Sequence, residues 1–168
     1  MGAKCTPKDS SGEGRRKMSD GLDVIIVDDE KQVCEVVAEN IRKFYTWGDV
    51  IAFTDYEDAA SFCLSRNKGL MIFILDVFVG NSNGFAFLDG IAGRYPNPHQ
   101  DTVMITGLAD DDIVDMCLAS GIGHLLEKPV RPYALQLAVR SIVMKYVKFA
   151  KKLLSDPELA EIIERIEN

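Results

Sequence analysis

Hydrophobic residues form five short runs, each ending on polar or charged side chains. The clearest run covers residues 70–75, six apolar residues without polar alternation that lead directly into Asp76. An uninterrupted apolar run is typical of a parallel strand covered on both faces. Gly80 and Gly84 follow with polar residues between them, which predicts a flexible loop after the acid. Further strands are predicted at residues 22–27, 50–53, 102–106 and 124–127.

The segments between these runs have helical periodicity. Helices are predicted after residue 30, after Thr54, around residues 85–91, over residues 110–120 and from Pro132 to about residue 154. Thr54 with Glu57 three residues later has the pattern of a capping box, and Gly121 is a suitable stop for the fourth helix. Strands alternating with helices predict an α/β domain with a parallel sheet and helices on both faces.

Composition narrows the class of protein. The 168 residues fit one domain, and 47% are hydrophobic. A net charge of -7 argues against direct nucleic-acid or anionic-membrane binding. No apolar run is long enough to span a bilayer. The four cysteines are scattered, without a CxxC pair, so neither a disulfide framework nor a zinc site is predicted, and a reducing cytoplasm is the simpler location.

Five polar side chains lie at or just after the ends of four predicted strands. They are Asp28, Asp29, Asp76, Thr106 and Lys128. The carboxyl ends of parallel strands share one edge of a sheet, so these side chains are expected to converge. Several carboxylates at one site repel each other unless a cation lies among them, and Mg²⁺ is a suitable ion because it binds a few carboxylates and phosphoryl oxygens. The pattern predicts a carboxylate that accepts a phosphoryl group.

These residues resemble the receiver domains of two-component response regulators. The resemblance covers roughly residues 22–154 and rests on four motifs in order: VDDE at 27–30, LDVFVGNSNG at 75–84, TG at 106–107 and EKP at 127–129. It implies a flavodoxin-like, doubly wound (βα)5 fold with a five-stranded parallel sheet. It also implies phosphoryl transfer from a histidine kinase or phosphotransfer protein, which switches the binding of a downstream partner that the sequence does not identify.

The resemblance assigns a role to each matched residue. Asp76 corresponds to the phosphorylated aspartate, Thr106 to the switch hydroxyl and Lys128 to the phosphate-binding lysine, with a cis peptide before Pro129. On this basis the domain is not a turnover enzyme but a switch that phosphorylates itself and dephosphorylates slowly.

The resemblance also implies how Mg²⁺ is held. Asp29 would bind the ion directly, and Asp28 would do so largely through water. Asp76 and the main-chain carbonyl of Phe78 complete the predicted metal ligands.

The chain departs from the usual receiver pattern in three respects. Gly80 replaces the common proline after the phosphorylation site, and Leu125 replaces the usual switch aromatic. Phe78 and Leu108 make the two variable positions beside the site large and apolar.

Two alternative functions stay open. One is a receiver that forms part of a larger DNA-binding regulator or hybrid kinase. The other is a magnesium-dependent phosphatase of the haloacid dehalogenase type, which also uses an aspartate nucleophile at a strand end. Such phosphatases normally have a second acid two residues later, where this chain has Phe78.

The two ends of the chain are predicted to lie outside the receiver domain, which is assigned to residues 21–154. Residues 1–20 are polar and predicted to be a disordered tail. Residues 155–168 are predicted to form a short extra helix, capped by Ser155 or Asp156 before Pro157. Its apolar residues need a cover, which is either the domain's own surface or a second copy in a homodimer through the C-terminal helices. The stripe consists of Leu159, Ile162, Ile163 and Ile166.

Overall fold

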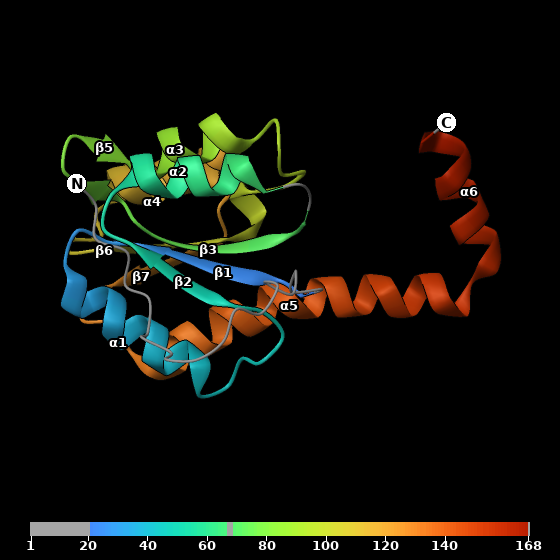
Figure 1. Ribbon diagram of the computed structural model, residues 1–168, viewed down its shortest axis with the longest axis horizontal. Coiled ribbons are helices and arrows are strands. Elements are labelled where there is room, and N and C mark those ends of the chain that lie inside the picture. Colours follow the sequence, from blue (N-terminus) through green and yellow to red (C-terminus); the bar gives the residue numbers. More distant parts are fainter. Residues whose placement is uncertain (1–20, 67–68, 168) are drawn as a thin grey trace, which may run out of the picture.

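A five-stranded parallel sheet forms the centre of the molecule (Figure 1). The computed structural model describes residues 21–66 and 69–167. The strand order is β2-β1-β3-β6-β7, which is the order of a doubly wound fold. The predicted α/β class and parallel sheet are therefore confirmed. The strands are β1 (Asp23–Val27), β2 (Val50–Phe53), β3 (Met71–Asp76), β6 (Thr102–Thr106) and β7 (His124–Glu127).

Helices cover both faces of this sheet (Figure 1). One face carries α2, α3 and α4, and the other carries α1 and α5. A short 3-10 turn, η1 (His99–Asp101), precedes β6. The helices are α1 (Lys31–Arg42), α2 (Tyr56–Ser65), α3 (Gly84–Ile91), α4 (Asp111–Ser120), α5 (Pro132–Ser155) and α6 (Pro157–Glu167).

The lack of polar alternation in the strands is explained by the two cores. In β1, Ile25 and Val27 belong to the hydrophobic cluster on one face, while Val24 and Ile26 belong to the cluster on the other. All residues of β1, β3 and β6 are buried. Because successive side chains point to opposite faces, a strand covered on both sides needs apolar residues at nearly every position.

The helix ends agree with the sequence patterns in part. The predicted cap of α2 by Thr54 is wrong, because the helix begins one residue later and Asp55 accepts a hydrogen bond from the Asp58 amide at 2.8 Å. Asp110 caps α4 in the same way, and Gly121 ends that helix with φ 76°, as predicted. Both short acidic side chains satisfy amides of the first turn that have no partner within the helix.

A short hairpin replaces the flexible loop that was predicted after Asp76. Strands β4 (Phe78–Val79) and β5 (Ser82–Asn83) pair in antiparallel fashion. Gly80 turns the chain with φ 58°, a conformation that glycine adopts without a steric penalty. Asn83 then caps α3 by accepting a hydrogen bond from the Ala86 amide at 2.8 Å. Gly80 therefore lies in a defined turn, and Gly84 is the first residue of α3.

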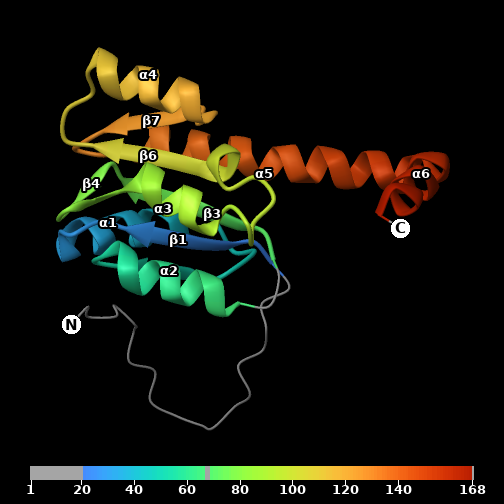
Figure 2. The same cartoon turned by 90° about the horizontal axis from the view of Figure 1, so that it is seen from above.

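The C-terminal helices extend away from the sheet (Figures 1 and 2). Val143 is the last buried residue of α5. Beyond it, Lys145 Nζ lies 2.6 Å from Asp101 Oδ1, and the Tyr146 hydroxyl donates to the other carboxylate oxygen of Asp101. These contacts attach α5 to η1 at the point where the helix leaves the domain. Of the two predicted caps of α6, Asp156 is the one used, accepting from the Leu159 amide at 3.1 Å.

The N-terminal tail and membrane-spanning helices were the subject of two further predictions. The tail predicted at residues 1–20 lies outside the described residues. Among the helices that the structure does describe, none has the length and apolar character needed to cross a membrane.

Candidate functional site

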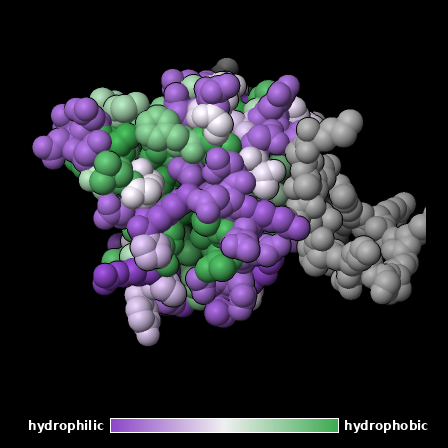
Figure 3. All heavy atoms as spheres, turned by 90° about the vertical axis from the view of Figure 1, so that its left-hand side faces the viewer, coloured by the Kyte–Doolittle hydropathy of each residue, from purple (hydrophilic) through white to green (hydrophobic). Residues whose placement is uncertain are grey.

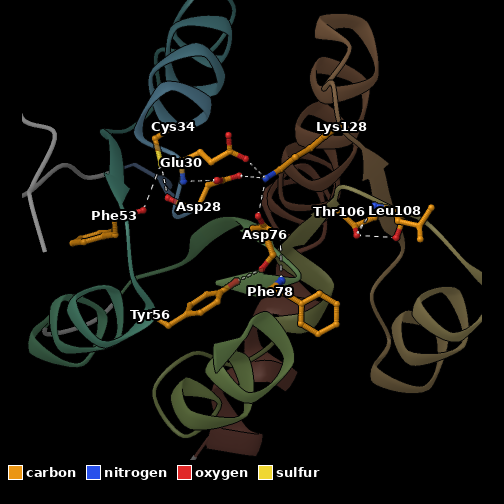
Figure 4. Close-up of polar contacts among 10 residues, drawn as sticks. All are labelled: Asp28, Glu30, Cys34, Phe53, Tyr56, Asp76, Phe78, Thr106, Leu108 and Lys128. Atoms are coloured by element: carbon orange, nitrogen blue, oxygen red, sulfur yellow. Dashed lines mark hydrogen bonds and ion pairs between the residues drawn. The ribbon is translucent and has the colours of Figure 1, made fainter. Parts of the chain in front are cut away.

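The candidate site lies where the strands end. Asp28 follows β1, Asp76 is the last residue of β3, Thr106 is the last residue of β6, and Lys128 follows β7. Figure 4 shows Asp28, Asp76 and Lys128 pointing toward one another from three parts of the sheet edge. Figure 3 views the molecule from this side and shows hydrophilic side chains across the middle of the face, with hydrophobic patches beside them.

Lys128 is the centre of the polar contacts. Its Nζ lies 2.7 Å from Asp76 Oδ2, 2.7 Å from Asp28 Oδ2 and 3.7 Å from Glu30 Oε1. The side chains of Asp28 and Asp76 are 3% and 9% exposed, so water replaces little of this contact, whereas Glu30 is 67% exposed. Three carboxylates thus face one ammonium, and the site attracts a further cation.

Burial and charge act in opposite directions on these groups. Burial raises the pKa of Asp28 above its ordinary value, although Lys128 and the Glu30 amide partly offset this effect. Burial on its own would lower the pKa of Lys128, but its close contacts with the negative carboxylates of Asp28 and Asp76 outweigh burial and raise it. Lys128 therefore stays protonated at neutral pH and compensates the two buried acids.

The donors at this edge fit a divalent cation. Asp28 Oδ2 is buried and, although it lies close to Lys128, it has no aligned hydrogen-bond donor among the described residues. Carboxylate oxygens of Asp28, Asp29 and Glu30 lie within 4.8 Å of one another. An acidic cluster with only oxygen ligands suits Mg²⁺. Glu30 was not among the predicted metal ligands. Lys128 lies between Glu30 and Asp76 and contacts both carboxylates (Figure 4).

One hydrogen bond positions the carboxylate of Asp76, and another holds its main-chain carbonyl. The Phe78 amide donates to Asp76 Oδ1 at 3.1 Å, so the β4 strand positions the carboxylate. The Tyr56 hydroxyl donates to the main-chain carbonyl of Asp76. Burial raises the pKa of Tyr56, and the nearby charges of Asp76 and Asp28 raise it further, so this hydroxyl stays a donor. The sequence analysis missed Tyr56 because a tyrosine at the start of an amphipathic helix carries no signal for such a contact.

Thr106 lies at the predicted edge, but its hydroxyl does not contact Asp76 in this structure. The Thr106 hydroxyl donates to the Leu108 carbonyl at 2.9 Å. The Leu108 amide in turn donates to the Thr106 hydroxyl oxygen at 3.3 Å. The Thr106 carbonyl accepts from the Lys128 amide at 2.8 Å, which ties the two strand ends together. The Thr106 hydroxyl has one proton, so it must break its hydrogen bond to the Leu108 carbonyl before it can donate to an acceptor bound to Asp76.

The departures from the receiver pattern also have defined places. Phe78 and Leu108 are 59% and 67% exposed and lie beside the site (Figure 4). Leu125 is partly buried and packs against the core on the α2, α3 and α4 face. The peptide bond before Pro129 is cis, as predicted.

Comparison with known proteins gives a family match and curated relatives. The sequence model of the family described as response regulator receiver domain matches residues 24–140. The cyclic di-GMP phosphodiesterase response regulator RpfG of Xanthomonas campestris is 30% identical over 134 residues, covering 74% of this chain and 32% of RpfG. The transcriptional regulatory protein CitT of Bacillus subtilis is 28% identical over 140 residues, covering 83% of this chain and 58% of CitT. The chain thus spans between a third and three fifths of these relatives.

Solved structures have the same fold. The chemotaxis protein CheY4 of Vibrio cholerae has a TM-score of 0.63 with 19% identity, covering 73% of this chain and 98% of CheY4. A response regulator receiver domain protein from Clostridium thermocellum has a TM-score of 0.65 with 20% identity, covering 79% and 98%. At 19% and 20% sequence identity, the similarity shows that these proteins share the arrangement of strands and helices with this chain.

Proposed function

Because the chain belongs to the response regulator receiver domain family and therefore acts as a phosphoacceptor in two-component signalling, we propose that Asp76 is the residue phosphorylated. The donor is a phosphohistidine of a histidine kinase or phosphotransfer protein. A carboxylate oxygen of Asp76 forms a bond to phosphorus as the bond from phosphorus to the histidine nitrogen breaks, and the leaving imidazole takes up a proton. The observation that carries this assignment is the contact of Lys128 Nζ with Asp76 Oδ2 at 2.7 Å.

Lys128 has two functions in this proposal. Before transfer it compensates the charges of Asp28 and Asp76. During transfer it stabilises negative charge on the phosphoryl oxygens, because its ammonium already points at the accepting carboxylate.

The metal ligands that we propose are Asp28, Asp29, Asp76 and the Phe78 carbonyl, with Glu30 close enough to take part through water. When bound, Mg²⁺ neutralises charge on the phosphoryl group. Oδ2 of Asp28 supports a ligand function, because it accepts no aligned hydrogen bond among the described residues and shares its ammonium partner, Lys128, with Asp76. The Phe78 carbonyl belongs to the same residue whose amide positions Asp76.

Thr106 couples phosphorylation to the surface. We propose that its hydroxyl leaves the Leu108 carbonyl and donates to a phosphoryl oxygen on Asp76. The loop after β6 then loses the hydrogen bond that holds Leu108, and the population shifts toward a second arrangement of this loop. Because α4 follows the loop directly, the change reaches the surface that a downstream protein partner binds.

This activity is that of a switch rather than a turnover enzyme, and it includes slow loss of the phosphoryl group. The dehalogenase-type alternative is not favoured, because Phe78 stands where such a phosphatase needs a second acid. We propose residues 21–154 as the receiver domain and residues 155–168 as a C-terminal extension. We propose a cytoplasmic location because the phosphodonor is a histidine kinase or phosphotransfer protein, and the reduced thiols of Cys63 and Cys117 agree with a reducing compartment.

The test is phosphorylation by a small phosphodonor with Mg²⁺. Asp76→Asn is expected to abolish the addition of one acid- and base-labile phosphoryl group, measured by intact-protein mass spectrometry. Asp89→Asn is the matched control, because Asp89 is 76% exposed and lies outside the site. Equal labelling of Asp76→Asn and the wild type would overturn the assignment.

A further inference from the structure

The C-terminal helix α6 has an apolar stripe that is largely uncovered. Ile162 and Ile166 are 50% and 77% exposed, while Leu159 and Ile163 are half-buried. Figures 1 and 2 show α6 at the far end of α5, away from the sheet. A helix of 11 residues is marginal in water without tertiary contacts, so the stripe calls for a partner surface.

The helix cannot fold back along its own α5. Only Asp156 separates the end of α5 at Ser155 from the start of α6 at Pro157. Antiparallel helix pairs need connections of about 2–5 residues, because their axes lie about 8–10 Å apart. A surface from a different chain is therefore required for side-by-side packing.

A matching surface exists on the distal half of α5, residues 144–155, which we name the α5 arm. The apolar stripe that packs Val139 and Val143 into the core continues along the arm at spacings of three and four residues. Leu154 is 86% exposed. The stripe of the arm consists of Val147, Ala150, Leu153 and Leu154.

The two surfaces have opposite charges. The α5 arm carries four lysines and no acidic residue, a net charge of +4, whereas α6 carries four glutamates and one arginine, a net charge of -3. Lys145 is already paired with Asp101, and the other three lysines of the arm are exposed. Two arms packed on each other would bring like charges together, whereas α6 on an arm brings opposite charges together.

We propose that two copies of this chain form a dimer in which α6 of each copy packs on the α5 arm of the other. The arrangement has two-fold symmetry, so each contact occurs twice. The contacts of Lys145 and Tyr146 with Asp101 attach the base of each arm to its own domain. The dimer uses none of the residues assigned to phosphoryl transfer, so it goes beyond the proposed function and forms with or without a phosphoryl group.

Molar mass in solution, measured by sedimentation equilibrium of the full chain over a wide concentration range, tests the apolar contact. The wild type is expected to dimerise, and Ile162→Asp with Ile163→Asp is expected to weaken the dimer at least about tenfold. Val36→Asp is the control, because Val36 is 55% exposed on α1, far from α6 in the chain. A monomeric wild type, or an Ile162→Asp, Ile163→Asp variant that dimerises as tightly as the wild type, would overturn the proposal.

A charge exchange tests the pairing itself. Lys148→Glu, Lys151→Glu and Lys152→Glu together change the net charge of the arm from +4 to -2, and Glu161→Lys with Glu164→Lys changes that of α6 from -3 to +1. Each variant alone is expected to be monomeric, since its own arm and α6 then repel, while an equimolar mixture is expected to form a heterodimer in which both contacts are complementary. If the α6 variant alone still dimerises like the wild type, the arms pair with each other and the proposal is wrong. A mixture that stays monomeric also rejects it. Circular dichroism checks that each variant keeps the fold.

Discussion

Replacing Lys128 by methionine isolates the energy with which one ammonium compensates two buried acids. Methionine keeps most of the apolar stem and removes the charge that lies 2.7 Å from both Asp28 and Asp76. Removing one partner of a buried ion pair costs about 3–5 kcal/mol, because the remaining charge is left without water or a counterion. The two acids are 3% and 9% exposed, so this range applies without a large correction for solvent.

Urea unfolding at pH 7 in the presence of a chelator measures this loss. With a denaturant dependence of about 2 kcal/mol per molar urea, a loss of about 4 kcal/mol lowers the midpoint by about 2 M. Lys31→Met is the matched control. Lys31 is 62% exposed and lies 3.8 Å from Glu35, and such a surface pair contributes about 0.5 kcal/mol or less.

Three further measurements identify the cause of the loss. Lys128→Met with Asp28→Asn is expected to recover much of the stability, because one of the two uncompensated charges is gone. The loss from Lys128→Met is expected to shrink as the pH falls, since burial raises the pKa of Asp28 and protonation of this carboxylate removes an uncompensated charge. Mg²⁺ at about 100 times its dissociation constant adds about 2.7 kcal/mol to any variant that binds it. A loss below about 1 kcal/mol for Lys128→Met would refute the reasoning, because the acids would then be solvated rather than buried.

Three other outcomes follow from the site. Mg²⁺ affinity, measured by calorimetry, is expected to fall as the pH drops, because burial raises the pKa of Asp28 and the ion needs the ionised form; a flat pH profile would contradict a ligand function. Tyr56→Phe is expected to lower the free energy of unfolding by about 1–3 kcal/mol in urea titrations, since the Asp76 carbonyl loses its donor; an unchanged midpoint would show that water replaces the hydroxyl. Phe78→Asn with Leu108→Glu is expected to speed the decay of phosphorylated Asp76 at least about tenfold, because polar groups there orient the attacking water; decay as slow as in the wild type would disprove this.

The strands and most helices were predictable because their patterns are local. An apolar run such as residues 70–75 specifies a strand buried on both faces wherever it occurs, and β3 covers most of it. Gly121 likewise ends α4, since the positive φ is a property of that one residue. The wrong cap at α2 has the opposite origin. Thr54 and Asp55 are both good caps, and a shift of one residue depends on how the following helix packs.

The site could be predicted in outline but not in its hydrogen bonds. The convergence of Asp28, Asp76 and Lys128 follows from the shared edge of a parallel sheet, and the alternation of strands and helices predicts that sheet. The bond from Tyr56 to the Asp76 carbonyl joins residues 20 apart in the chain through the packing of α2 on the sheet, and no sequence spacing encodes it. The hydroxyl of Thr106 is a similar case, because its rotamer depends on the conformation of the next two residues.

The anchor of α5 at Asp101 makes that helix a mechanical lever. α5 begins at Pro132, four residues after Lys128, and continues to Ser155 on the other side of the pivot at Lys145. At 1.5 Å per residue, the arms of the lever measure about 20 Å toward the phosphoryl site and about 15 Å toward α6. A displacement of about 1 Å at Pro132 therefore becomes a displacement of about 0.8 Å in the opposite direction at Ser155, as long as the helix stays rigid.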